Sequence, residues 1–398
     1  KNVYHVYPTS HSPTSMYPGY SNFGPTSFSG GWGPRNPNWD KDALAVNTWM
    51  ARNQQVLTQG RADVDVAVYM HSFEWPAGAL VNTDGSPFMN RHWENQALQR
   101  AGYSWDYVNP TLLASQDANV IGGILNASGP SYKVLVINTG LQPRRHPDKK
   151  AMPLATAKRL LELAKDGLKI LLVGDAPSLA PGNNGNDAQV QAVIADLLAQ
   201  PTVRRVASEA NVPSSLAAWG VEPDMTPIRP SALFSRHLKD RSAATDYYYL
   251  YNQGEERLDW ASRDMVYEEP EACRYTGTSR PCRQVGEPIE IDVTLTGEGA
   301  PYLLDTVSGE ITPISTYTAR DGKVTVKVAL GRDESMIVAL TADPRRFGVQ
   351  ALKRHVVSTT ADSALIRGDR VVLRDTNPGT YSATLSDGST VSATIAEV

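Results

Sequence analysis

Aromatic, amide and guanidinium side chains are concentrated between Tyr4 and Trp39, in the sequence YHVYPTSHSPTSMYPGYSNFGPTSFSGGWGPRNPNW. Proline and glycine recur in this segment and interrupt both helices and strands, so we expect a long ordered loop that presents the aromatic rings. A sugar ring has apolar C–H faces and a rim of hydroxyl groups, which flat aromatic faces and N–H donors suit. The composition therefore favours a polysaccharide or glycoside site, with a proline-rich packing loop as the alternative.

Several residues of this segment are candidate sugar ligands. His5 and Tyr7 lie at the end of a short predicted strand and are candidates to hydrogen-bond sugar hydroxyls, although His5 could instead be a core histidine with protein partners. Trp32 and Trp39 are candidates to stack on sugar faces, and large aromatics also serve as loop anchors.

Two polar residues lie just before the next predicted helix. Arg35 is flanked by prolines. It is a candidate donor to an anionic or hydroxyl-rich group, or else a partner of an acid such as Asp40. Asn38 is either a sugar ligand or, in the commoner role of such a residue, a helix cap.

A carboxylate and a histidine follow the first predicted strand of the next domain. His71 is a candidate substrate ligand there, and Glu74 is the best candidate catalytic acid in the chain. The neighbouring Trp75 could desolvate Glu74 and raise its pKa, as a general acid requires. A solvated loop glutamate is the ordinary alternative.

The remaining elements must position these loops. Apolar residues recur at helical spacing after the aromatic segment and predict a helix at about 41–59 that Gly60 ends. Short apolar strands then alternate with amphipathic helices, which is typical of a parallel sheet covered on both faces. We predict a doubly wound, flavodoxin-like or Rossmann-like domain over residues 62–241. Its predicted strands are VDVAVYM (64–70), WDYV (105–108), KVLVIN (133–138), KILLVG (169–174) and TVRRVA (202–207), and its helices lie near 93–101, 154–164 and 187–199.

Strands replace helices in the C-terminal part. YYYLYNQ, IEIDVTL, VTVKVAL, MIVAL, RVVLRD and YSATL alternate or run apolar, with turn sequences between them. This pattern predicts a β-sandwich over residues 242–348 and a small β unit over 349–398.

The composition limits the possible functions. The chain has 398 residues, 41% of them hydrophobic, which is enough for two or three cores, and a formal net charge of −4. Charges of both signs are interspersed, so we expect no nucleic-acid or membrane-surface partner. No apolar run approaches the ~20 residues that span a bilayer. The doubly wound segment lacks GxGxxG and GxxxxGK[ST], which argues against dinucleotide and P-loop sites, while flavin binding stays open.

Cys273 and Cys282 bracket the turn-rich segment RYTGTSRP. A local disulfide would close this segment, which has little apolar material of its own, and would indicate a secreted or periplasmic protein. Two unpaired thiols are the alternative. No second cluster of cysteine or histidine accompanies the pair, so we predict no metal site here.

Three motifs resemble glycoside hydrolase family 106, the α-L-rhamnosidase-like enzymes. The first runs from YHVYP through SGGWGPRNPNWDKDALAVNTWMARNQQVLTQGRADVDVAVYM, the second is GYSWDYVN (102–109), and the third is PYLLDTVSGEITPI (301–314). The second is similar to the family's Gly-Phe-x-Asp-Tyr-(Ile/Val)-Asn element. The third is similar to a segment that reads Trp-Asp-x-x-Thr-Gly-Glu in the family, with Leu304 in the place of the tryptophan.

The resemblance implies that a (β/α)8, TIM-type barrel precedes these modules. Residues 1–61 would then be the last barrel strand, its active-site loop and its helix, with the rest of the barrel in a missing segment or on a second polypeptide. Family members hydrolyse with two carboxylates and bind calcium, and most of those acids lie upstream of the part that is present here. We therefore expect the catalytic carboxylates partly outside this chain, and a calcium ion only in the whole enzyme.

These observations predict part of a secreted glycoside hydrolase that cleaves terminal, rhamnoside-like sugars by a two-carboxylate mechanism. The expected partners are the carbohydrate and the barrel-bearing polypeptide. Further copies of the chain, in a homo-oligomer, are an additional option. Two alternatives stay open: a non-catalytic carbohydrate-binding or assembly chain of a larger complex, and a flavodoxin-like redox protein.

Overall fold

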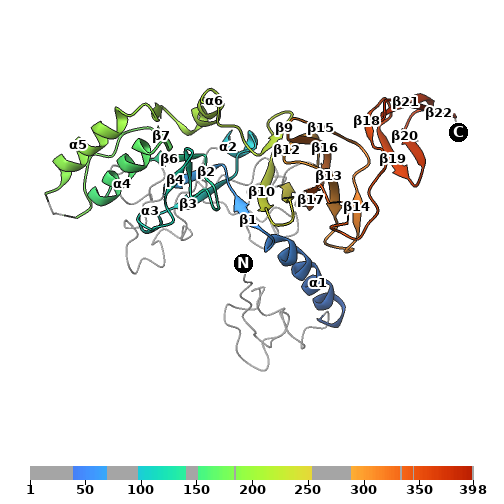
Figure 1. Cartoon of the computed structure of the whole chain (residues 1–398), viewed down its shortest axis with the longest axis horizontal. Coiled ribbons are helices and arrows are strands. Elements are labelled where there is room, and N and C mark those ends of the chain that lie inside the picture. The colour runs from blue at the N-terminus through green and yellow to red at the C-terminus, as the bar shows by residue number, and fades with distance from the viewer. Residues whose placement is uncertain are drawn as a thin grey trace, which may run out of the picture.

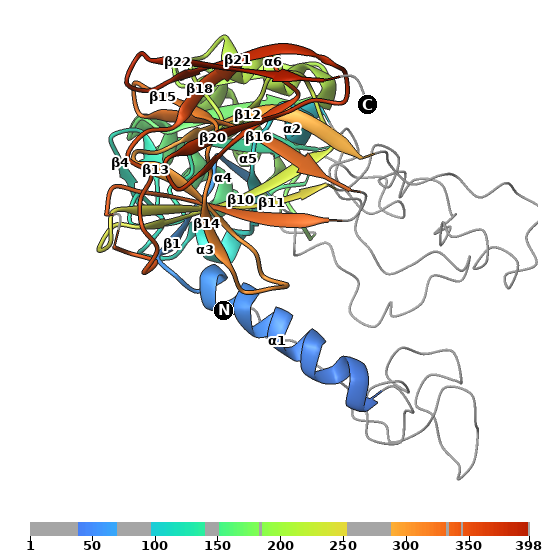
Figure 2. The same cartoon turned by 90° about the vertical axis from the view of Figure 1, so that its right-hand side faces the viewer.

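The computed structural model describes residues 39–69, 97–139, 151–182, 185–252, 288–331, 334–343 and 345–396. A doubly wound α/β domain, a β-sandwich and a small terminal β unit follow one another along the long axis of the molecule (Figure 1). Helix α1 (Trp39–Leu57) projects away from these three units (Figure 2). No helix in the described ranges combines the length and the apolar character needed to cross a membrane.

Five parallel strands form the centre of the α/β domain, and the sequence predicted each of them. They pair in the order β3-β2-β6-β7-β8. In chain order this is second, first, third, fourth and fifth, which is the flavodoxin-like order. The strands are β2 (Val66–Tyr69), β3 (Trp105–Val108), β6 (Val134–Asn138), β7 (Lys169–Val173) and β8 (Val203–Val206).

Helices cover both faces of this sheet. They include α2 (Ala97–Arg100), α3 (Pro110–Leu113), α4 (Leu154–Lys165), α5 (Asp187–Leu198) and α6 (Val212–Ala217). Alternate residues of β2 point to opposite faces, so Ala67 and Tyr69 pack with α4 and α5, while Val66 and Val68 pack with α2 and α6. Burial on both faces explains why the three inner strands, β2, β6 and β7, are continuous apolar runs. A short hairpin of β4 (Val120–Ile121) and β5 (Ile124–Leu125) precedes β6.

Two antiparallel sheets form the sandwich. The larger has the order β1-β10-β11-β17-β13-β14 and the smaller β15-β16-β12-β9. Leu250 and Val338 of the larger sheet share a core with Val293 and Val326 of the smaller. The strands are β1 (Arg61–Asp63), β9 (Met225–Pro227), β10 (Leu233–Asp240), β11 (Thr245–Asn252), β12 (Ile289–Thr296), β13 (Ala300–Leu304), β14 (Ile311–Pro313), β15 (Tyr317–Arg320), β16 (Lys323–Leu330) and β17 (Ser335–Thr341).

Three strands within the range predicted for the α/β domain, 62–241, pair in the sandwich instead. β1 pairs with β10, and β9 pairs with β12. The α/β domain is therefore an insertion between β1 and β9, and the chain crosses between the two domains at 63–66 and again at 221–225. β1 and β9 have only three residues each, and the inward positions of β10 include Ser235 and His237, so none of the three shows the apolar alternation of a half-buried strand.

The two ends of the described chain pack on the sandwich differently. Helix α1 stops near the predicted Gly60, whose positive φ of 60° and close approach to the Lys239 carbonyl leave no room for a side chain. The terminal unit follows the sandwich and is built from two small sheets with little buried apolar surface. Its strands are β18 (Val356–Thr359), β19 (Ser363–Arg367), β20 (Arg370–Arg374), β21 (Gly379–Leu385) and β22 (Thr390–Ile395).

Candidate functional site

Nearly all of the site residues predicted from the sequence lie outside the described ranges, and their roles stay predictions. Trp39 is described only as the first backbone position of α1. The others are His5, Tyr7, Trp32, Arg35, Asn38, His71, Glu74, Cys273 and Cys282.

Two of these residues, His71 and Glu74, come after a strand of the parallel sheet whose carboxyl end is described. In an open parallel sheet, ligands bind beyond the carboxyl ends of the strands, where the strand order reverses. Here the order reverses between β2 and β6, which end at Tyr69 and Asn138. His71 and Glu74 come directly after β2 in the sequence. The contribution of His71 and Glu74 to a site at this edge stays a prediction.

Polar groups are already ordered at that carboxyl edge. Asn138 is 2% exposed, and its Nδ2 donates to Oε1 of Glu209 at 2.6 Å. The hydroxyl of Thr139 donates to the carbonyl oxygen of Asp175 at 3.0 Å. These bonds tie the end of β6 to the segment after β8 and to the segment after β7.

The opposite, amino edge of the sheet holds a buried network of charged residues. Lys133, just before β6, donates from Nζ to Asp65 Oδ1 and Asp224 Oδ1, both at 2.6 Å, and to the Glu222 carbonyl at 2.8 Å. Asp65 is fully buried and also accepts from the backbone N–H and the hydroxyl of Ser104, both at 2.9 Å. Burial alone would lower the pKa of Lys133, but the two carboxylates hold it above its usual value.

His237 extends this network into the sandwich. Its Nδ1 lies 2.8 Å from Asp224 Oδ2 and its Nε2 lies 2.9 Å from Asp246 Oδ1, while the ring stacks on Tyr248 at a centroid distance of 4.3 Å. Burial by itself lowers the pKa of His237, and the hydrogen bonds to Asp224 and Asp246 outweigh it and raise the pKa to about 9. The imidazolium therefore donates from both nitrogens at neutral pH.

This network joins the two domains rather than serving a substrate. Asp65 and Asp224 lie at the two places where the chain crosses between the domains, and His237 is only 1% exposed. Lys133 has its three ammonium protons engaged. The charges also nearly balance within the described residues, with four acids and three cations: Asp63, Asp65, Asp224, Asp246, Lys133, Lys239 and His237.

The same cluster does not fit a calcium ion. Asp63, Asp224 and His237 each place a potential ligand atom within 4.8 Å of the others. Calcium takes six to eight oxygen ligands. Here, however, the Lys239 ammonium lies 3.3 Å from Asp63, and both ring nitrogens of His237 are bonded to carboxylates. Protein cations thus occupy the positions that a metal ion would need.

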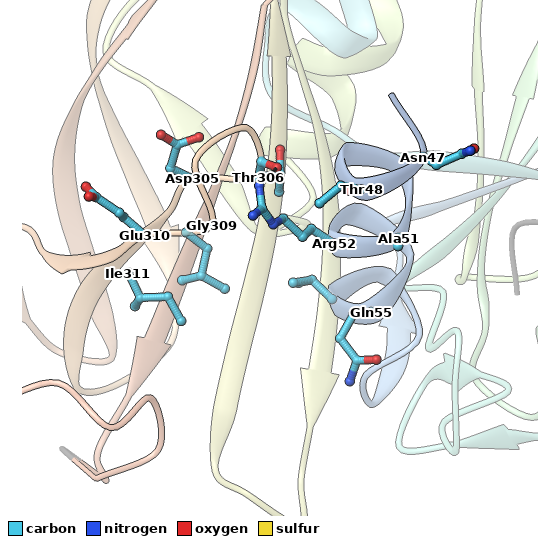
Figure 3. A pocket seen from close by; sticks show the side chains of 12 residues that line it. Asn47, Thr48, Ala51, Arg52, Gln55, Asp305, Thr306, Gly309, Glu310 and Ile311 are labelled. Atoms are coloured by element: carbon cyan, nitrogen blue, oxygen red, sulfur yellow. Dashed lines mark hydrogen bonds between the residues drawn. The ribbon is translucent and has the colours of Figure 1, made fainter. Parts of the chain in front are cut away.

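A groove of about 590 Å³ lies between α1 and the hairpin that joins β13 and β14 (Figure 3). Arg52 reaches across it from the helix, and its Nη1 donates to the carbonyl oxygens of Thr306 and Val307. The groove is lined by Asn47, Thr48, Ala51, Arg52, Gln55 and Val56 of α1, and by Leu304, Asp305, Thr306, Gly309, Glu310 and Ile311 of the hairpin.

The hairpin residues of this groove are those of the third sequence motif. Asp305 Oδ1 accepts from the backbone N–H groups of Val307 at 2.8 Å and Ser308 at 3.2 Å, which closes a tight turn. Gly309 has a φ of 83°, and a Cβ there would lie 2.7 Å from the guanidinium carbon of Arg52. The motif DTVSGE therefore anchors α1 to the sandwich and presents main-chain acceptors to a single arginine.

The profile of a protein family described as Glyco_hydro_106, alpha-L-rhamnosidase, matches residues 2–267, which are 266 of the 398 residues. The chain belongs to this family. The resemblance to this family is thereby confirmed, and the first two of the three motifs lie within the matched residues.

Two solved structures of glycosidases align with this chain. A rhamnosidase from Novosphingobium sp. PP1Y aligns with a TM-score of 0.53 and 22% identity, over 87% of this chain and 31% of that one. An alpha-L-fucosidase isoenzyme 2 from Paenibacillus thiaminolyticus gives a TM-score of 0.41 and 11% identity, over 74% of this chain and 51% of that one. The chain spans about a third of the length of the similar rhamnosidase. No curated protein sequence matches it.

Sequence reasoning did not find the network at the amino edge, although two signals were present. Asp65 interrupts an otherwise apolar strand, and Lys133 directly precedes one. A charge next to a fully buried strand needs a partner. The partner, Asp224, is 159 positions from Asp65 and 91 from Lys133, beyond the reach of any local pattern.

Proposed function

We propose that this chain is the C-terminal part of a glycoside hydrolase that removes a terminal, rhamnose-like sugar with two carboxylates, one protonating the leaving oxygen and the other serving as base or nucleophile. The observation that carries the proposal is the family match, which runs through the aromatic loop, α1 and the whole inserted α/β domain. Glu74 is the proposed acid from this chain, and at least one further carboxylate comes from the part of the enzyme that corresponds to the remainder of the rhamnosidase.

We assign residues 1–61 to the last strand, active-site loop and helix of a barrel. The surface of α1 supports this assignment, because Leu44 is 76% exposed and Val46 is 37% exposed on a helix that projects from the described domains (Figure 2). Apolar side chains at such a position favour a neighbouring element that covers them. His5, Tyr7, Trp32 and Arg35 would then lie on the loop at the barrel mouth, where barrel enzymes bind substrate.

The further parts of the proposal follow from the resemblance and from two residues. A location outside the cytoplasm rests on the suggested pairing of Cys273 with Cys282. A calcium ion, if the whole enzyme binds one, is held elsewhere than at Asp63, Asp224 and His237, which do not fit it.

The test is hydrolysis of an aryl α-L-rhamnoside by this 398-residue chain and by the same chain extended with the sequence encoded upstream of Lys1. We expect turnover only with the extended protein, and absence of turnover there would contradict the proposal. In the extended protein, Trp32→Ala should lower kcat/KM by about 5-fold to 150-fold, the equivalent of roughly 1–3 kcal/mol of stacking, with little change in melting temperature.

Trp219→Ala provides the matched control. Trp219 is half-buried in the core of the α/β domain, and Arg204 lies over its ring at 4.5 Å. This change should lower the melting temperature and leave kcat/KM per folded molecule unchanged. If the Trp32 variant behaved in the same way, Trp32 would be a packing residue.

A further inference from the structure

A polar pocket of about 570 Å³ lies where the two domains and the end of α1 meet. Three segments form its wall: the connection from α1 through β1 (58–63), the turn before β6 (128–131) and the turn between β10 and β11 (239–242). Its lining residues are Thr58, Gln59, Gly60, Arg61, Ala62, Asp63, Ser128, Gly129, Ser131, Lys239, Asp240, Arg241 and Ser242. The candidate catalytic loops follow the other edge of the sheet, so this pocket requires a separate explanation.

Two arginines of the pocket have no acidic partner in the described part of the chain. Arg61 Nη1 donates to the carbonyl oxygen of Ser128 at 2.8 Å, and Arg241 Nη2 donates to that of Ala127 at 3.2 Å. Both guanidinium groups therefore bond to consecutive carbonyls of one turn. A guanidinium has five N–H donors, so each arginine keeps several for another acceptor.

The acids of the pocket are already neutralised. Asp63 accepts from Lys239 at 3.3 Å, and Asp240 accepts from Arg346 at 3.1 Å and from the Ser242 hydroxyl at 2.6 Å. The lining residues carry three positive and two negative charges, in a protein whose formal net charge is −4. An excess of positive charge with unshared donors is the environment that attracts a carboxylate or another oxyanion.

The turn that holds the two arginines is rigid. The backbone N–H groups of Gly129 and Ser131 both donate to the Asn126 carbonyl, at 2.9 Å and 3.0 Å, and the Pro130 carbonyl accepts from Val64 at 2.8 Å. Gly129 has a φ of 117°, and a Cβ on it would lie 3.0 Å from Cβ of Arg61, so the arginine stem lies against the glycine backbone. The donors are thus positioned before any ligand arrives, which reduces the entropic cost of binding.

The size and lining of the pocket indicate more than a bare anion. A volume of about 570 Å³ is within the range of small-molecule sites. Besides the two arginines, the hydroxyls of Thr58, Ser128 and Ser131 line it. Each of them donates to a protein oxygen, at 3.2–3.4 Å, and keeps its lone pairs to accept from the hydroxyls of a sugar. A lone sulfate or phosphate has no donor for these acceptors.

We propose that this pocket binds a saccharide that carries a carboxylate, that is, a uronic acid residue of an acidic glycan, with Arg61 and Arg241 on the carboxylate. The choice of a saccharide rests on the proposed glycosidase function, whereas the choice of an anion rests on the two arginines alone. The site would retain acidic glycan chains near the enzyme.

The test is calorimetric titration of the purified extended protein with a diuronate, with its neutral disaccharide counterpart and with inorganic sulfate. We expect the diuronate to bind at least about tenfold more tightly than either of the others, and its affinity to fall as salt is raised from low to high concentration. The double variant Arg61→Gln/Arg241→Gln should lose at least about tenfold of the diuronate affinity, because hydrogen bonds to charged groups are removed.

Arg229→Gln is the matched control, since Arg229 is exposed and lies outside the pocket. It should bind the diuronate like the unmodified protein. Equal binding of the neutral disaccharide, binding of sulfate as tight as that of the diuronate, or an unchanged affinity in the double variant would each overturn the inference. Turnover of an uncharged aryl rhamnoside by the extended enzyme does not depend on this pocket, so failure of the inference and failure of the proposed function give different results.

Discussion

Protonation of His237 should make the stability of the protein depend on pH. The folded-state pKa is raised from 6.5 to about 9 by the two carboxylates. The stabilisation is therefore fully present below pH 6.5, decreases as the pH rises, and is lost above about 9. A shift of this size corresponds to about 3 kcal/mol, at 1.36 kcal/mol for each pKa unit, and the ring is too buried for solvent to screen much of it.

The assay is urea unfolding at a series of pH values between 6 and 9.5, for the unmodified protein and for His237→Gln. The free energy of unfolding of the unmodified protein should fall by about 3 kcal/mol more over this range than that of the variant, which has no group to titrate at this position. His355→Gln is the control, because His355 lies in the terminal unit against Tyr317 and burial lowers its pKa. That variant should keep the fall above pH 6.5. Parallel curves for the unmodified protein and His237→Gln would refute the assignment of a charged His237.

Two further substitutions test how the domains and the helix are held. Lys133→Met should lower the free energy of unfolding by about 3–5 kcal/mol, because it leaves the buried carboxylate of Asp65 without its cation, while Asp224 keeps His237. Lys158→Met, on the exposed side of α4, should change it by no more than about 0.5 kcal/mol in urea unfolding. Gly309 and Gly322 both have a positive φ, 83° and 71°, so an alanine at either position is strained. Only at Gly309 would the added Cβ also meet Arg52, so Gly309→Ala should lower the melting temperature more than Gly322→Ala. Equal effects of the two lysine variants, or of the two glycine variants, would contradict these contacts.

The sequence predicted the elements whose burial is uniform. Strands β6 and β7 were located to within a residue, because a strand that is buried on both faces is apolar almost throughout. Strand β10 was missed, because its inward positions include Ser235 and His237, which read as solvent-facing. Strand β1 has three residues and no apolar alternation, so only its pairing with β10 identifies it.

The candidate sites were predictable to different degrees. The family was recognisable from short motifs, and the first two of them lie within the residues that the family profile matches. The network of Asp65, Lys133, Asp224 and His237 was not predictable, since its partners come from both sides of an inserted domain. The contact of both Arg61 and Arg241 with one turn was not predictable for the same reason.

The position of the α/β domain as an insertion explains why the contacts between the two domains lie at the amino edge of the parallel sheet. Both chain crossings meet the sandwich at the amino edge, so that edge must be closed by contacts that hold the domains together, and Lys133 and His237 provide them. Among the described residues, the network that joins the domains lies at the amino edge, whereas the candidate residues His71 and Glu74 follow a strand at the carboxyl edge in the sequence. Substitutions at the amino edge should consequently change stability and its pH dependence, whereas substitutions such as Glu74→Gln should change turnover in the extended enzyme at constant stability.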